Sequence, residues 1–239
     1  MFINTDARST ASEIMDDLDM EGDLLRRSLD KLDWINKWLG GNQITLSGLE
    51  QLLQTVPKTQ TLTIVDVGCG SGDMLRIIAQ KMRTAGRTVQ LIGIDANAFT
   101  VDYARQQSLA YPEITYHCCL VPSAVFDQLD YDILLSTLFL HHLTNEEIIP
   151  LLKHSSEKAR LGIIVNDLHR SKLAYFLFQL LTLFIPNPMI RQDGLTSILR
   201  GFKIDELRAF TQQNNFKNST IRWRWAFRYQ WIIDTRIKK

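Results

Sequence analysis

A strand that runs directly into three closely spaced glycines constrains the fold of this chain more than any other feature. Residues 65–73 read Val-Asp-Val-Gly-Cys-Gly-Ser-Gly-Asp, at the end of a β-branched apolar run over 61–67. Such a run is typical of a strand buried on both faces, and a helical pattern over 73–84 follows. Glycines suit a sharp turn close to a ligand, and the helix N-terminus behind them offers free N–H groups. This segment predicts a strand–loop–helix unit that binds a polar or anionic ligand.

Strands and helices continue to alternate along the chain. Further strands are expected at 89–94, 114–119, 131–136 and 161–167, with helices at 99–109 and 145–158. A helix is also expected at 205–214, and two closing strands over 219–233 with a tight turn near Ala226. This order favours a Rossmann-like α/β fold with a mostly parallel, seven-stranded sheet and helices on both faces.

Two helical segments lie outside this alternation. Apolar residues at helical spacing predict helices within residues 13–53, broken at Gly40-Gly41-Asn42, and we expect residues 1–56 to form an N-terminal helical cap. The Rossmann-like domain then covers 57–239, with a helical insertion at about 170–200. The apolar helix in that insertion could form a lid over an apolar substrate or belong to the core.

Composition excludes several classes of function. The formal net charge of the 239 residues is +1, whereas proteins that neutralise many phosphates carry a marked basic excess, so nucleic acid is not expected as a partner. The three cysteines show no CxxC spacing, which favours a reduced, cytoplasmic protein. The N-terminus does not resemble a secretory signal, and the apolar segment after Lys172 is too short for a transmembrane span.

The glycine segment resembles the first motif of class I methyltransferases, D-x-G-x-G-x-G, in Asp66-Val67-Gly68-Cys69-Gly70-Ser71-Gly72. The resemblance continues through Gly93-Ile94-Asp95 and through 132–136. It implies the class I methyltransferase fold and S-adenosylmethionine as cofactor, with Asp95 binding the ribose hydroxyls. The NAD fingerprint usually spaces its third glycine one residue further along. The expected cofactor-binding residues are Asp66, Gly68, Cys69, Gly70, Gly72, Asp95, Ala96, Cys119, Leu120 and Thr137.

The end of the third strand departs from that family. Many relatives place an aspartate there to bind the adenine amino group, whereas this chain has Cys118-Cys119-Leu120. Backbone groups of Cys119 or Leu120, or flanking apolar side chains, are the alternatives for recognising adenine.

A histidine pair follows the fourth strand, at the sheet edge where ligands bind in such folds. The segment 138–147 resembles the His-Asp-Trp-Ser-Asp segment of plant-type O-methyltransferases, and the resemblance implies that His141 is the general base. A base is useful because a phenol, with a pKa near ~10, is a poor nucleophile at neutral pH. Alternatively, the pair packs against the cofactor or caps the next helix. Expected substrate contacts are His142, Asp167, His169 and Arg191, although Asp167 could instead cap a helix.

A closer resemblance concerns the acceptor. Residues 191–202 and 36–41 resemble bacterial small-molecule methyltransferases related to the quinone-biosynthesis group, some of which accompany polyketide synthases that make phenolic lipids. It implies methylation of a phenolic or enolic oxygen on a small aromatic or lipid-like molecule. The alternatives are C-methylation of a quinone precursor, a nicotinamide oxidoreductase, and a non-catalytic protein that binds S-adenosylmethionine. No metal is expected, because no cluster of histidines and carboxylates has ligand spacing, and the oligomeric state stays open.

Overall fold

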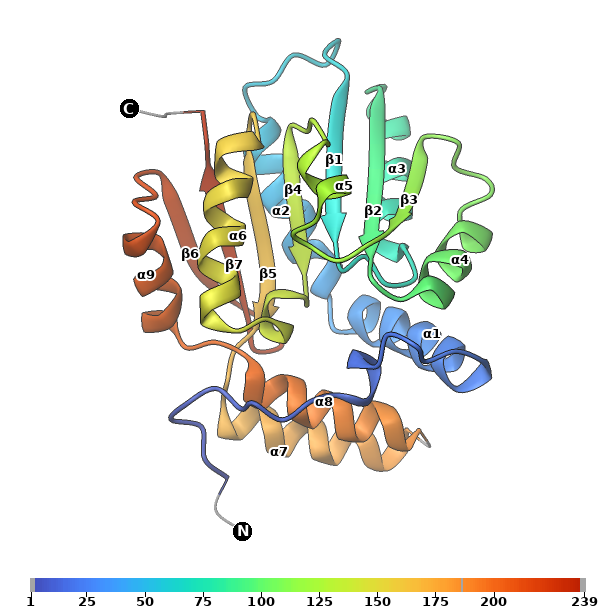
Figure 1. Cartoon of the computed structure of the whole chain (residues 1–239), viewed down its shortest axis with the longest axis vertical. Coiled ribbons are helices and arrows are strands. Elements are labelled where there is room, and N and C mark those ends of the chain that lie inside the picture. Colours follow the sequence, from blue (N-terminus) through green and yellow to red (C-terminus); the bar gives the residue numbers. More distant parts are fainter. Residues whose placement is uncertain (1–2, 186, 237–239) are drawn as a thin grey trace.

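The computed structural model describes residues 3–185 and 187–236, and its centre is one seven-stranded sheet (Figure 1). The strands lie in the order β3-β2-β1-β4-β5-β7-β6. The first five are parallel, whereas β7 is antiparallel to both of its neighbours. Their bounds are β1 Leu62–Val67, β2 Val89–Asp95, β3 Ile114–Cys118, β4 Ile133–Thr137, β5 Gly162–Leu168, β6 Ser219–Arg224 and β7 Arg228–Asp234. The Rossmann-like fold class expected from the sequence is confirmed.

Helices cover both faces of the sheet. The first layer consists of α2 (Gly41–Leu53), α3 (Asp73–Thr84) and α4 (Ala98–Gln107), and the second of α5 (Ala124–Asp127), α6 (Asn145–Lys158) and α9 (Ile204–Gln213). Each layer packs its apolar side chains against one side of the strands. In β1, Ile64 belongs to the first core, whereas Val65 and Val67 belong to the second. A strand buried on both faces explains the continuous apolar run in the sequence.

A cap of three helices lies beyond the carboxyl edge of the parallel strands, as Figure 1 shows. It contains α1 (Asp23–Trp38), α7 (Lys172–Leu181) and α8 (Pro188–Arg200). The sequence assigned residues 1–56 to the cap as one unit, but α2 packs with the sheet in the first core, whereas α1 and the residues before it lie at the edge. No helix in the described part of the chain is both long and apolar enough to cross a membrane.

The N-terminal strap, which we define as residues 3–22, crosses α8 and is mostly irregular. A helix was expected from Glu13 onwards, but only the short turn η1 (Ile14–Asp16) forms before α1. Gly22, at a φ of 91°, separates the two, since this backbone conformation interrupts a helix. Asp193 of α8 fixes the strap by accepting hydrogen bonds from the backbone N–H groups of Ile14 and Met15.

Helix α8 is the second helix of the insertion expected at about 170–200. Asn187 caps its first turn by accepting a hydrogen bond from the Ile190 N–H, and Pro188 occupies the first turn, where its missing N–H does no harm. Gly194 is tolerated inside the helix because the Phe178 ring of α7 occupies the space that a Cβ atom would need. The glycine therefore allows α7 and α8 to approach closely.

Candidate active site

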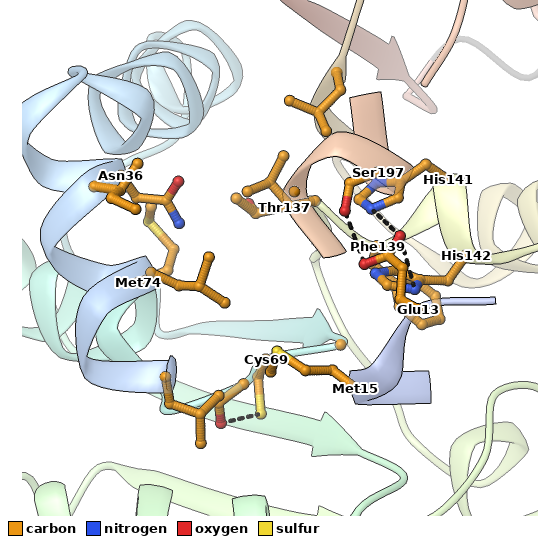
Figure 2. Close-up of a pocket in the computed structure, with 18 of the residues that line it drawn as sticks. Glu13, Met15, Asn36, Cys69, Met74, Thr137, Phe139, His141, His142 and Ser197 are labelled. Carbon is orange, nitrogen blue, oxygen red and sulfur yellow. Dashed lines mark hydrogen bonds and ion pairs between the residues drawn. The ribbon is translucent and has the colours of Figure 1, made fainter. Parts of the chain in front are cut away.

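A cavity of about 770 Å³ lies between the carboxyl edge of the sheet and the cap. The glycine loop after β1 and the loops after β2, β3, β4 and β5 form its floor, while the strap, α1, α7 and α8 complete its walls. Figure 2 shows His141, His142, Glu13 and Ser197 together on one side of the cavity, with Asn36 and Met74 on the opposite side. The cavity thus joins segments that are far apart in the sequence.

The glycine loop has the conformation that its sequence requires. Gly68 and Gly72 have φ values of 67° and 76°, in the left-handed region that favours glycine. A Cβ atom at Gly68 would collide with the Phe139 ring, and one at Gly72 would collide with the Tyr116 hydroxyl. Among the predicted cofactor contacts in this loop, Gly68, Cys69 and Gly70 line the cavity, whereas Gly72 does not and instead precedes α3 as its N-cap.

Asp95 holds the glycine loop in place. Its Oδ2 accepts a hydrogen bond of 3.0 Å from the Gly70 N–H, and its Oδ1 accepts one of 3.1 Å from the Asn97 N–H. Asp95, predicted to bind the ribose, and Ala96, predicted as a cofactor contact, both line the cavity. Burial raises the pKa of Asp95 above its usual range, so the carboxyl group benefits from any further hydrogen-bond donor.

Four carboxyl groups face the half of the cavity beside the glycine loop, those of Asp33, Asp66, Asp73 and Asp95. Burial, followed by the charges of Asp73 and Asp95, raises the pKa of Asp66 well above its usual range, and Asp66 Oδ1 has no hydrogen-bond partner. Burial and the charge of Asp73 also raise the pKa of Asp33 to about 7. Crowded carboxyl groups ionise more readily when a cation lies among them, so this half of the cavity suits a positively charged ligand.

The other predicted cofactor positions lie at the ends of neighbouring strands. Cys119, Leu120 and Thr137 line the cavity. The Cys119 N–H already donates to the Asp95 carbonyl at 3.0 Å, so this N–H is not available to adenine. Leu120 is 62% exposed and offers an apolar surface. Thr137 Oγ1 lies 3.1 Å from Thr45 Oγ1 of α2, which ties the end of β4 to that helix.

The histidine pair after β4 is held by two carboxylates. His141 Nδ1 lies 2.7 Å from Asp167 Oδ1, and the His141 backbone N–H donates to Asp167 Oδ2 at 3.2 Å. His142 Nδ1 lies 2.7 Å from Asp16 Oδ1 of the strap. The two rings lie side by side with centroids 4.2 Å apart, and both line the cavity. The side chain of His141 is 2% exposed, whereas that of His142 is 28% exposed.

Asp167 does not line the cavity, although the sequence predicted it as a substrate contact. It lies behind His141 at the end of β5, fully buried. Burial alone would raise its pKa, but the charge and hydrogen bond of His141 hold that pKa below its usual range. An ionised Asp167 accepts a hydrogen bond from Nδ1–H, which leaves the Nε2 lone pair of a neutral His141 free to take a proton. Its role is therefore to orient His141.

Glu13 was missed by the sequence analysis. Its Oε1 lies 3.7 Å from His141 Nε2, and both atoms are buried without a hydrogen-bond partner. Ser197 Oγ of α8 donates to Glu13 Oε2 at 2.8 Å, and burial raises the pKa of Glu13 to about 6. Possible ligand atoms of Glu13, His141 and His142 lie within 4.8 Å of one another, close enough to hold a metal ion. Only the folded strap brings the carboxyl group to the histidines, so no sequence spacing could reveal this group.

Of the two remaining predicted substrate contacts, one lines the cavity and the other does not. His169 lines the cavity, and Trp223 Nε1–H donates to its Nδ1 at 3.2 Å. Burial and the charges of Arg170 and Lys203 lower the pKa of His169, which favours its neutral form. Arg191 is exposed on α8 and does not line the cavity, so the structure does not support it as a substrate contact.

Much of the rest of the cavity wall is apolar. It is formed mainly by leucine, isoleucine and phenylalanine side chains of α1, α7 and α8. One face of α7 supplies Leu177, Phe178 and Leu181 to this wall. The cavity therefore combines an acidic half beside the glycine loop with an apolar half beneath the cap.

The central part of the chain matches a known family. Residues 64–160 match the family described as a methyltransferase domain. This segment is a methyltransferase domain. It spans the glycine loop, Asp95 and the histidine pair, whereas the strap, Asp167 and the apolar helices lie outside it. No curated protein sequence matches the chain significantly.

Solved structures of methyltransferases share the fold. The plantazolicin methyltransferase BpumL in complex with SAH has a TM-score of 0.66 and 14% identity, with 87% of this chain and 90% of that chain covered. Magnesium protoporphyrin IX methyltransferase from Synechocystis PCC 6803 with bound SAH has a TM-score of 0.55 and 18% identity, with coverage of 90% and 89%. The CurJ carbon methyltransferase has a TM-score of 0.60 and 10% identity, with coverage of 80% and 54%. The methyltransferase domain thus lies within a class I methyltransferase fold.

Proposed function

We propose that this methyltransferase transfers the methyl group of S-adenosylmethionine to a phenolic or enolic oxygen of a small aromatic or lipid-like acceptor. The observation that carries the proposal is the buried Asp167–His141 pair at the edge of a partly apolar cavity, beside the glycine loop. The pair provides a base for a weakly acidic hydroxyl, and the apolar wall provides surface for an aromatic or alkyl group.

The charge of the cavity supports the cofactor. S-adenosylmethionine carries a sulfonium and an ammonium group, both of which four carboxyl groups can stabilise. The pyrophosphate of NAD would meet the same carboxyl groups with like charge, and like charges in a buried site repel strongly. Asp66 Oδ1, which is buried and without a partner, is placed to accept a hydrogen bond from an ammonium group.

When bound, S-adenosylmethionine supplies an electrophilic methyl group, so the protein must mainly align the acceptor and remove its proton. In our proposal, His141 Nε2 takes the hydroxyl proton and Asp167 stabilises the imidazolium that forms. In this structure the Glu13 carboxyl group lies next to the buried Nε2 atom of His141. In our proposal the acceptor hydroxyl therefore displaces the Glu13 carboxyl group from that nitrogen. Methylation converts the hydroxyl into an ether and releases one proton, which His141 carries.

Methylation of carbon is the second candidate. It is favoured by the structural similarity to carbon methyltransferases such as CurJ, a similarity of fold. A histidine held by a carboxylate could also remove a proton from a carbon between two carbonyl groups. The position of the new methyl group in the product, determined by NMR, distinguishes the two reactions.

The cofactor and acceptor are tested together. Isothermal titration is expected to show S-adenosylmethionine and S-adenosylhomocysteine binding with Kd values on the order of micromolar, and no binding of NAD. Mass spectrometry should then detect methylation of a 5-alkylresorcinol or a 4-hydroxy-2-pyrone. Binding of NAD without S-adenosylmethionine would refute the cofactor, whereas methylation of quinone precursors at carbon alone would refute the oxygen acceptor.

Asp95 offers a quantitative test of the cofactor site. Replacement by alanine removes the bonds to the Gly70 and Asn97 N–H groups as well as a charged acceptor for the ribose. Because hydrogen bonds to charged groups contribute about 1.5–3 kcal/mol, the variant should bind S-adenosylhomocysteine at least about tenfold more weakly in isothermal titration. The control is Asp102→Ala on the exposed side of α4, which should bind as wild type does. Equal affinities for Asp95→Ala and wild type would show that the ribose is held elsewhere.

A further inference from the structure

Arg228 is a buried cation without a counterion among the residues that the structure describes. It begins β7, is 3% exposed and lines the cavity. Its Nη2 donates to Asn36 Oδ1 of α1 at 2.7 Å, but Nε and Nη1 have no hydrogen-bond partner. The equally buried Arg170 contrasts with it, because that guanidinium pairs with the Glu206 carboxylate and donates to backbone carbonyl groups.

The nearby carboxylates do not neutralise Arg228. Asp73 and Asp167 contribute attraction over distance, but neither is within ion-pair distance of its guanidinium. Asp73 is bonded to Asn42 and Asp167 to His141. Burial lowers the pKa of Arg228 to about 10, so it still carries its charge at neutral pH. An uncompensated buried charge is strongly unfavourable and calls for a partner.

We propose that Arg228, together with Asn36, is the carboxylate-binding site of this cavity. A guanidinium group binds a carboxylate with two parallel hydrogen bonds from one edge, either Nε with Nη2 or Nη1 with Nη2. Because Asn36 uses only one of the two N–H groups of Nη2 and both Nε and Nη1 are unpartnered, one such edge of Arg228 remains available. Asn36 points into the cavity (Figure 2) and contributes its amide beside the guanidinium. The carboxylate comes from the amino-acid part of S-adenosylmethionine, which rests on the proposed function, or from the acceptor.

The missing counterion also predicts an unusual effect on stability. Removing an unpaired buried charge relieves its desolvation, so Arg228→Met should melt at the same temperature as the wild type or higher in the absence of ligand. Weaker ligand binding combined with an intact or more stable fold is the result expected of a binding residue. A residue with a purely structural role would instead lose stability when replaced.

The experiment compares two ligands that differ in the amino-acid group. Isothermal titration measures S-adenosylhomocysteine and 5′-methylthioadenosine, which lacks the carboxylate, with wild type and Arg228→Met. We expect the variant to bind S-adenosylhomocysteine at least about tenfold more weakly, with 5′-methylthioadenosine changed by less than about twofold. The matched control is Arg224→Met on the adjacent strand, which is outside the cavity and bonded to Gln230 and should bind both ligands as wild type does.

An acceptor carboxylate would give a different pattern. In saturating S-adenosylhomocysteine, benzoate but not benzamide would then raise the melting temperature of the wild type, and Arg228→Met would lose that effect while binding both nucleosides normally. If neither S-adenosylhomocysteine nor benzoate distinguishes the variant from wild type, the proposal is overturned. Should Arg228→Met fail to fold, Arg228→Lys, which keeps the charge but loses the planar fork, takes its place. A wild type that binds no S-adenosylhomocysteine refutes the proposed cofactor, and the comparison of benzoate with benzamide, repeated without nucleoside, then decides on Arg228.

Discussion

Replacement of His141 by alanine is expected to lower kcat by a factor of about 10²–10⁴, the usual contribution of a general base. The acceptor hydroxyl would lose the only nitrogen that the buried pair with Asp167 orients toward it. The affinity for S-adenosylhomocysteine should change little, because His141 acts on the acceptor. Steady-state rates with the acceptor identified by mass spectrometry, together with isothermal titration, measure both quantities.

His142→Ala is the internal control for this prediction. His142 is bonded to Asp16 and is more exposed than His141, so its loss should affect kcat much less. If His142→Ala lowers kcat strongly and His141→Ala does not, His142 is the base. If both variants lose affinity for S-adenosylhomocysteine at an unchanged saturated rate, the histidines form part of the cofactor wall.

Asp167→Asn should also lower kcat by about 10²–10⁴, although it changes a single atom. The neutral amide can no longer stabilise the imidazolium, and its NH₂ group can hold His141 in the tautomer whose Nε2 carries the proton.

A stability measurement accompanies the Asp167 variant. The native pKa of Asp167 lies below its ordinary value, so the carboxylate stabilises the fold above the pKa of the unfolded chain. That stabilisation is lost as pH falls through the lower, native value. Urea unfolding at several pH values should show a smaller loss on acidification for Asp167→Asn. An unchanged kcat in a folded variant would show that His141 does not depend on Asp167.

Features encoded over short stretches could be predicted from the sequence. The glycine loop and Asp95 follow strands whose apolar runs are recognisable, and parallel strands bring their carboxyl ends to one edge. For the same reason the sequence placed His141 and Asp167 at that edge. It did not show that Asp167 would turn behind the histidine, because a strand pattern gives the position of a residue but not the partner of its side chain.

Features that depend on distant segments could not be predicted. Glu13 reaches His141 only because Asp193 and Ser197 of α8 hold the strap across the cavity. Arg228 is one of several arginines in the C-terminal segment, and burial beneath α1 and α2 alone distinguishes it. The sequence predicted a helical insertion at about 170–200, but not the close approach of α7 and α8, which depends on the Phe178 ring filling the space beside Gly194.

The division of the cavity between two parts of the chain has an evolutionary consequence. Residues 64–160, which carry the family match, supply most of the floor of the cavity, where we propose that the methyl donor binds. The strap, α7 and α8, which line the part of the cavity that we propose for the acceptor, all lie outside this segment. Substitutions in these outer segments could therefore give descendants new acceptors while the machinery for the donor stays intact. Equally, two proteins that match the same family over this segment need not share a substrate, and their acceptors are better compared through the strap and the cap.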